Sequence, residues 1–190
     1  KKPVTYVPKK SNNKHLVLLD CGVKHGIIRE LLKKEYKITR IPFDRDPSAV
    51  SHIDGVAVSN GPGDPKKCGT TIANIQRVID KGIPFLGICL GHQLLALAIG
   101  ADTYKLKYGH RGLNQPCLDL TNNKAYVTSQ NHGYAVNRET IPRGFEEWFI
   151  NLNDHTNEGI KHTSKKIAGV QFHPEGNPGP CDTDWIFSFI

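Results

Sequence analysis

The chain has 190 residues, a length typical of one globular domain, and 38% of them are apolar and 23% charged. No apolar run approaches the roughly 20 residues that a membrane helix needs, so the sequence predicts neither a membrane protein nor a disordered chain. The net charge of +7 is spread over short lysine pairs and not over a basic block. This pattern is typical of a solvated surface and argues against nucleic-acid binding.

The cysteines are odd in number and widely separated, which fits neither a paired disulfide framework nor a CxxC zinc site. They are Cys21, Cys68, Cys89, Cys117 and Cys181. Reduced thiols are therefore expected, and the sequence shows no charged-then-apolar secretory leader. Both observations favour a cytoplasmic location.

Two kinds of apolar spacing alternate in the first hundred residues. Residues 1–14 are polar, contain two prolines and are expected to form a linker, with one domain spanning residues 15–190. Short apolar runs predict strands, and apolar residues at helical spacing predict helices. The expected strands are 15–19, 38–43, 55–59 and 84–88, and the expected helices are 27–34, 70–81 and 92–99. This alternation predicts parallel strands with right-handed crossovers.

After residue 100 the pattern becomes rich in strands. The expected strands are 102–107, 124–129, 147–151 and 167–172, before a last helix near 182–190. The sequence therefore predicts an α/β fold. Its mixed, mostly parallel central sheet is flanked by helices and has antiparallel additions in the C-terminal half.

Cys89 stands between Gly87 and Gly91, where a predicted strand meets a predicted helix. This is the cysteine form of the G-x-S-x-G nucleophile elbow, a sharp turn that leaves no room for side chains beside the nucleophile. The helix N-terminus that follows favours a thiolate. The alternative is a buried structural cysteine between two packing glycines.

His173 and Glu175 lie two residues apart at the end of a predicted strand. Side chains at this spacing share one face of an extended chain, and Pro174 favours an extended His173. Glu175 could hold one ring nitrogen while the other faces a nucleophile. The alternative is a turn that carries an ordinary surface histidine and glutamate.

A glycine-rich loop at residues 59–65 follows another predicted strand. Glycines let the backbone approach a ligand closely, so an amide of this loop and the amide of Leu90 could stabilise an oxyanion. Such loops also bind phosphate, but neither GxxxxGK[ST] nor GxGxxG is present.

In this order and at these separations, the three segments resemble the class I glutamine amidotransferases, whose triad is Cys, His and Glu. Further stretches resemble the glutaminase domain of carbamoyl phosphate synthetases; they are residues 19–24, 60–65, 109–116, 128–134, 156–160 and 178–180. The similarity runs from about residue 15 to the C-terminus.

The resemblance implies a nucleophile at Cys89, a base at His173 and an orienting carboxylate at Glu175. It also implies oxyanion donors from the backbone of Gly61 and Leu90. The residues expected to hold glutamine are Gly63, Gln93, Asn131, Gly133 and Tyr134. Relatives carry an additional N-terminal domain that contributes a serine, so the pocket is expected to be incomplete on one side.

The implied activity is hydrolysis of glutamine to glutamate and ammonia through a cysteine thioester. Ammonia would pass to a carbamoyl phosphate synthetase subunit or fused domain in pyrimidine biosynthesis, with arginine biosynthesis as a second destination. No cofactor or metal is expected in this domain, because ATP, Mg²⁺ and bicarbonate would belong to the synthetase. Two alternatives stay open: a glutaminase of another synthase, such as an anthranilate-type enzyme, and a non-catalytic regulatory module of the same fold.

Overall fold

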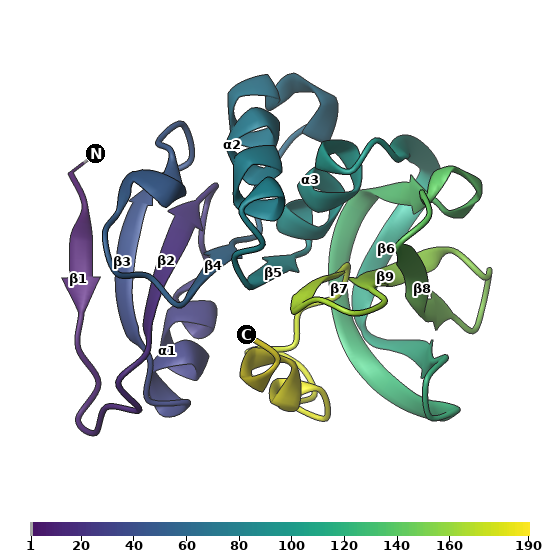
Figure 1. Ribbon diagram of the computed structural model, residues 1–190. Helices are drawn as coiled ribbons and strands as arrows, with labels where there is room; N and C mark the ends of the chain where they lie inside the picture. The colour runs from purple at the N-terminus through teal and green to yellow at the C-terminus, as the bar shows by residue number, and fades with distance from the viewer. Residues whose placement is uncertain (1) are drawn as a thin grey trace.

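The computed structural model describes residues 2–190, and its centre is one mixed sheet of ten strands (Figure 1). The strands are β1 (Val4–Tyr6), β2 (His15–Asp20), β3 (Lys37–Pro42), β4 (Gly55–Val58), β5 (Phe85–Ile88), β6 (Asp102–Asp119), β7 (Lys124–Asn137), β8 (Phe145–Asn151), β9 (Asn157–His162) and β10 (Ile167–Val170). Their order across the sheet is β1-β3-β2-β4-β5-β10-β9-β8-β6-β7.

The sheet has a parallel half and an antiparallel half. β3, β2, β4, β5 and β10 are parallel neighbours. From β10 outward, β9, β8, β6 and β7 are antiparallel, and β1 is antiparallel to β3 at the opposite edge. The expected α/β fold with antiparallel additions in the C-terminal half is confirmed.

Helices cover both faces of the parallel half. α1 (His25–Lys33) lies on one face with the C-terminal 3-10 turn, and α2 (Gly69–Asp80) and α3 (Leu90–Ala98) lie on the other (Figure 1). β2 shows the reason, because Leu16 and Leu18 pack in the core beneath α1 while Val17 and Leu19 pack beneath α2 and α3. Strands buried on both faces read as continuous apolar runs, as expected for parallel sheets.

β6 and β7 continue to Asp119 and Asn137, well beyond the expected strands 102–107 and 124–129. Three further expectations differ from the structure. Val4–Tyr6, inside the expected linker, forms β1 and pairs with β3. Asn157–His162 forms the unexpected strand β9. The expected last helix is only a 3-10 turn at Asp184–Ser188, whose Ile186 and Phe187 are buried against the sheet. In all three places, long-range packing decides the structure more than local sequence pattern.

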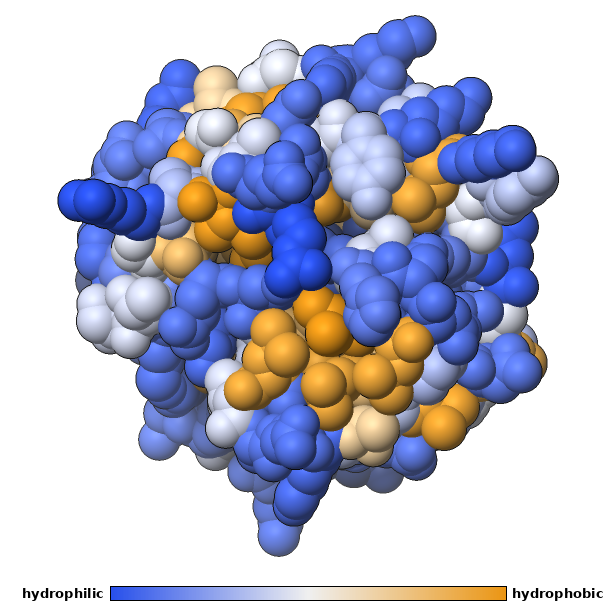
Figure 2. All heavy atoms as spheres, turned by 90° about the vertical axis from the view of Figure 1, so that its right-hand side faces the viewer, coloured by the Kyte–Doolittle hydropathy of each residue, from blue (hydrophilic) through white to orange (hydrophobic). Residues whose placement is uncertain are grey.

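The antiparallel half carries an apolar surface. Of the nine exposed large hydrophobic side chains within residues 2–190, six lie in this half; they are Tyr104, Tyr108, Leu113, Leu120, Val127 and Leu152. Figure 2 shows this end of the molecule, where hydrophobic residues (orange) interrupt the hydrophilic surface (blue). Val127 on β7 pairs with Pro116 on β6, whose carbonyl accepts a hydrogen bond from Leu152 beyond β8, so part of this surface is continuous across three strands. No helix within residues 2–190 combines the length and apolar character that a membrane crossing would require.

Candidate active site

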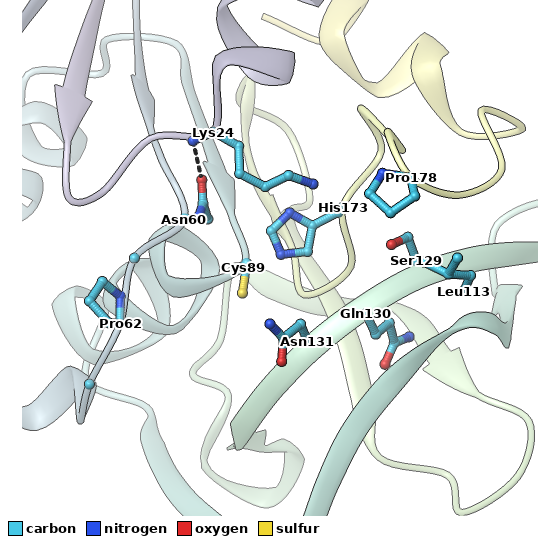
Figure 3. A pocket seen from close by; sticks show the side chains of 12 residues that line it. Lys24, Asn60, Pro62, Cys89, Leu113, Ser129, Gln130, Asn131, His173 and Pro178 are labelled. Atoms are coloured by element: carbon cyan, nitrogen blue, oxygen red, sulfur yellow. Dashed lines mark hydrogen bonds between the residues drawn. The ribbon is translucent and has the colours of Figure 1, made fainter.

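A cavity of about 670 Å³ opens at the carboxyl edge of the parallel strands, within the size range of small-molecule sites (Figure 3). Its lining comes from segments that are far apart in sequence: Lys24, Asn60, Gly61, Pro62, Gly63, Cys89, Leu113, Ser129, Gln130, Asn131, His173 and Pro178. The elbow, the glycine-rich loop and the residues around His173 therefore meet in one place.

Cys89 forms a strained turn between β5 and α3. Its φ of 54° and ψ of −103° are unusual for a residue with a side chain, and such strain concentrates at functional sites. A Cβ on Gly87 would lie 2.4 Å from the Gly91 carbonyl oxygen, and a Cβ on Gly91 would lie 2.3 Å from the Val58 carbonyl oxygen. Both glycines are therefore required sterically, as the elbow interpretation predicts.

His173 lies beside Cys89 and is held from behind by Glu175. Its Nδ1 donates to Glu175 Oε1 at 2.7 Å, so Nε2 is left to face the thiol side of the cavity (Figure 3). Its backbone N–H donates to the Ser129 carbonyl of β7 at 2.8 Å. The histidine is fixed both through its ring and through its backbone.

The charges of this group favour an ion pair. Burial alone would lower the pKa of His173, but hydrogen bonds and negative charge from Cys89 and Glu175 outweigh it and raise that pKa to about 9. Burial of Glu175 would raise its pKa, but His173 and the Lys24 ammonium hold it below the usual value. At neutral pH the arrangement therefore pairs an imidazolium with a carboxylate beside the Cys89 sulfur.

The two expected oxyanion donors are neighbours in space. A Cβ on Gly61 would lie 2.3 Å from the Cys21 carbonyl oxygen and 2.8 Å from Leu90 Cδ2, so only glycine fits between these groups. Asn60 fixes the loop, because its side chain accepts from Lys24 N and donates to the Gly22 carbonyl. The loop thus packs against the first residue of α3, and Gly61 lines the cavity while Leu90 does not.

The residues expected to hold glutamine fall into two groups. Gly63 and Asn131 line the cavity. Gln93 lies behind the elbow, where its Nε2 donates to the Tyr134 carbonyl and to Gln171 Oε1, both at 2.9 Å. Gly133 and Tyr134 follow Asn131 on β7 and do not line this cavity.

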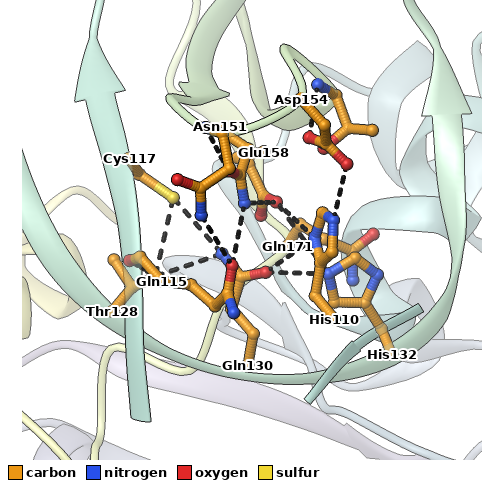
Figure 4. A network of polar contacts seen from close by, with 12 residues as sticks. His110, Gln115, Cys117, Thr128, Gln130, His132, Asn151, Asp154, Glu158 and Gln171 are labelled. Carbon is orange, nitrogen blue, oxygen red and sulfur yellow. Dashed lines mark hydrogen bonds and ion pairs between the residues drawn. The ribbon is translucent and has the colours of Figure 1, made fainter. Parts of the chain in front are cut away.

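A buried polar network joins β6, β7, β8 and β9 (Figure 4). Gln130 Oε1 lies 3.0 Å from both His110 Nδ1 and His132 Nε2. His110 Nε2 also donates to Asp154 at 2.8 Å, and a hydrogen bond with Glu158 is the main reason that the His110 pKa rises to about 9. The network ties the strand that carries Asn131 to its neighbours.

Among residues 2–190, the side chains that come nearest to a metal-binding set are His110, His132 and Glu158, whose ligand atoms lie within 4.8 Å of one another. Two of these side chains hydrogen-bond each other, since His110 Nδ1 is 3.1 Å from Glu158 Oε1. His132 and the buried His92 have pKa values lowered to about 3, mainly by burial, which makes both poor bases at neutral pH.

Sequence reasoning assigned no role to several cavity residues. Lys24, Leu113, Ser129, Gln130 and Pro178 lie within stretches that carry the family resemblance, which was the available signal. Gln171, two residues before His173, contacts Cys89 from behind the cavity. Its role depends on how β10 packs beside α3, which no local pattern reveals.

Comparison with known sequences agrees with this geometry. Residues 17–190 match the family "Glutamine amidotransferase class-I". The chain is 50% identical over 175 residues to the carbamoyl phosphate synthase arginine-specific small chain of Hypocrea virens, covering 91% of this chain and 39% of that protein. It is 48% identical over 190 residues to the carbamoyl phosphate synthase small chain of Pyrococcus furiosus, covering 98% of this chain and 51% of that one. The chain thus spans about two fifths to one half of these relatives.

Solved structures share the fold. A putative GMP synthase protein from Thermoplasma acidophilum superposes with a TM-score of 0.80 at 24% identity, over 93% of this chain and 91% of that one. A glutamine amidotransferase of Thermotoga maritima gives a TM-score of 0.69 at 23% identity, over 94% and 83% of the two chains. The elbow, the cavity, the matched family and the half-identical relatives agree, and the chain belongs to the class I glutamine amidotransferase family.

Proposed function

We propose that the chain hydrolyses the side-chain amide of glutamine and supplies ammonia to a carbamoyl phosphate synthetase. The observation that carries the proposal is the order Cys89, His173, Glu175 at a strained elbow that opens into the cavity. The small-chain names of the half-identical relatives support the identity of the ammonia acceptor.

The chemistry follows from the charges of the three side chains. The Cys89 thiolate attacks the amide carbon of glutamine, and the carbonyl π electrons move onto oxygen, where the Gly61 and Leu90 amides stabilise them. When the tetrahedral intermediate collapses, the C–N bond breaks and His173 gives its proton to the departing ammonia. Water, deprotonated by His173, then attacks the γ-glutamyl thioester and releases glutamate and the thiolate.

Substrate recognition is assigned to the surrounding backbone and amides. Gly63 and Asn131 face the cavity directly, whereas Gln93 lies behind the elbow and donates to the Tyr134 carbonyl of β7. ATP, Mg²⁺ and bicarbonate are proposed to bind the synthetase and not this domain. The free cysteines support a cytoplasmic location.

The apolar surface of the antiparallel half supports assembly with a larger partner. Large exposed apolar areas on soluble domains mark interaction sites, and this surface includes Leu113, which also lines the cavity. We propose pyrimidine biosynthesis as the destination of the carbamoyl phosphate. The names of the fungal relatives favour arginine biosynthesis as a second destination.

Labelling and turnover test the chemistry. A glutamine-mimicking electrophile should modify Cys89, identified by peptide mass spectrometry, and Cys89→Ala should abolish ammonia release while circular dichroism stays unchanged. Cys181→Ala, which removes an exposed thiol, is the matched control and should behave as wild type. Labelling confined to other cysteines would overturn the assignment.

Adding the partner distinguishes the alternatives. With a carbamoyl phosphate synthetase, ATP and bicarbonate present, kcat for ammonia release should rise strongly, because displacement of a catalytic group by about 1 Å can cost on the order of 10²-fold. Stimulation by a different synthase would instead indicate an anthranilate-type glutaminase. A folded chain that stays inactive with every partner would indicate a regulatory module.

A further inference from the structure

Gln171 is a completely buried glutamine at the rear of the cavity, between the end of β10 and His173. Its Nε2 lies 3.6 Å from Cys89 Sγ, and its Oε1 accepts from Gln93 Nε2 at 2.9 Å. Its backbone N–H donates to the Glu158 carbonyl of β9 at 2.8 Å, which fixes the main chain from which the amide extends. One amide group therefore bridges the nucleophile and a residue expected to bind substrate.

Hydrogen bonds connect the Tyr134 carbonyl to Gln93 and Gln93 to Gln171, and this chain fixes which end of the Gln171 amide is the oxygen. The Tyr134 backbone carbonyl can only accept, so the end of Gln93 that lies 2.9 Å from it must be the NH₂ group. The same NH₂ meets Gln171, which must present its oxygen there. The NH₂ of Gln171 is consequently left facing the sulfur of Cys89.

A donor that faces sulfur has a chemical consequence. An amide N–H stabilises a thiolate far more than a thiol, because a hydrogen bond to a charged acceptor is stronger than one to a neutral acceptor. The same contact restricts the side-chain rotation of Cys89. His173 also interacts with the sulfur, so an imidazolium and an amide both contact it.

We propose that Gln171 is a positioning residue for the nucleophile, donating a hydrogen bond that holds the Cys89 sulfur in place and favours its thiolate form. The inference rests on the proposed glutaminase function only for its meaning in catalysis. Gln171 and the Tyr134 carbonyl thereby occupy both N–H groups of Gln93.

Alkylation of Cys89 tests the proposal without requiring any turnover. The rate of Cys89 modification by iodoacetamide, measured by peptide mass spectrometry between pH 5 and pH 10, gives the midpoint at which the thiolate forms. Gln171→Met keeps the length of the side chain and removes the donor, and should raise this midpoint by about one pH unit, the size expected for loss of a charge-assisted hydrogen bond. Gln171→Glu, which places a carboxylate against the sulfur, should raise it further.

The control makes the same chemical change elsewhere. Gln76→Met on α2, whose amide contacts Asp80, should leave the midpoint unchanged. An unchanged midpoint in folded Gln171→Met, or an equal shift in Gln76→Met, would overturn the proposal. If circular dichroism shows that the Gln171 variants do not fold, NMR of the wild type provides the test. The chemical shifts of the Gln171 side-chain amide should change with pH at the same midpoint as alkylation of Cys89. Chemical shifts that do not change with pH would overturn the inference.

Turnover separates this inference from the proposed function. In an active enzyme, the kcat of Gln171→Met should be lower than that of the wild type, and this difference should shrink as pH rises. The reason is that a larger fraction of Cys89 in the variant then becomes thiolate. A Gln171-dependent alkylation midpoint in a chain that hydrolyses no glutamine would contradict the proposed function and leave the positioning role intact. Glutamine hydrolysis at a rate that does not depend on Gln171 at any pH would support the proposed function and contradict the positioning role.

Discussion

Lys24 and His173 donate to the same carboxylate oxygen: Lys24 Nζ lies 2.9 Å and His173 Nδ1 2.7 Å from Glu175 Oε1. Lys24 also donates through Nζ to the Gly176 carbonyl and through its backbone to Asn60 of the glycine-rich loop. One residue thus joins Glu175, the proposed orienting carboxylate, to the loop that carries a proposed oxyanion donor.

Lys24→Met should reduce kcat several-fold more than Lys24→Arg. Without the ammonium, Glu175 binds the imidazolium more strongly, so the proton that ammonia needs is given up less readily, and the upper limb of the kcat–pH profile should move to higher pH. Steady-state ammonia release between pH 6 and pH 10 measures both effects. Lys33→Met removes a lysine paired with Glu30 on α1 and should change neither kcat nor its pH profile. If the upper limb of the kcat–pH profile stays in place in Lys24→Met, the proposed effect of Lys24 on Glu175 is contradicted.

His173 and Glu175 should contribute unequally to the rate. His173→Ala removes proton transfer itself, an effect of about 10²- to 10⁴-fold in kcat, whereas Glu175→Gln still allows a hydrogen bond to Nδ1 and should cost less. In the wild type, kcat should fall as pH rises through about 9, because His173 then loses the proton it gives to ammonia. Wild-type turnover by His173→Ala would exclude it as the base.

The elbow glycines make a stability prediction. Gly91→Ala places a methyl group 2.3 Å from the Val58 carbonyl oxygen and should lower the free energy of unfolding by about 1 to 3 kcal/mol, typical of overpacking. Gly69→Ala at the start of α2 meets nothing within 4 Å and should be neutral or stabilising by up to about 1 kcal/mol. Urea unfolding of both variants measures the difference, and equal midpoints would show that the elbow can relax.

The buried network should make stability depend on pH. Glu158, Asp154 and their hydrogen bonds raise the pKa of folded His110 to about 9 from 6.5. This contribution is fully present below pH 6.5 and is lost as pH rises through about 9. The fall in Tm between pH 6.5 and pH 9.5 should therefore be smaller in His110→Gln than in the wild type, whereas His162→Gln should keep the wild-type slope. Parallel Tm curves for His110→Gln and wild type would contradict the assignment.

The parts of the fold that were predictable from sequence are those governed by local pattern. β2, β4 and β5 are continuous apolar runs, and α2 shows clear helical spacing, so their bounds differ from expectation by only a residue or two. β1 was missed because Val4–Tyr6 is short, lies in polar sequence and exists through its pairing with β3. β9 was missed because its buried positions include Asn157 and Glu158, polar residues that are stabilised by partners on β8.

The site shows the same division. Cys89, His173 and Glu175 were predictable because each role requires a residue type at a fixed local spacing, and the structure brings all three together. The cavity also contains Gly61, Gly63 and Asn131, as expected from the resemblance. Lys24 and Gln171 could not be assigned in this way, because Lys24 meets Glu175 across 151 residues of chain and Gln171 meets Cys89 across 82.

The backbone bond from His173 to Ser129 has a mechanical consequence. Cys89 is fixed to the parallel half, through its own N–H to the Val170 carbonyl, while His173 is also attached to the β6–β7 hairpin. A displacement of this hairpin would therefore move His173 relative to Cys89 and change the distance between the imidazole and the sulfur. Binding of another molecule to the outer end of the sheet could in this way alter the geometry of the proposed proton transfer between His173 and Cys89.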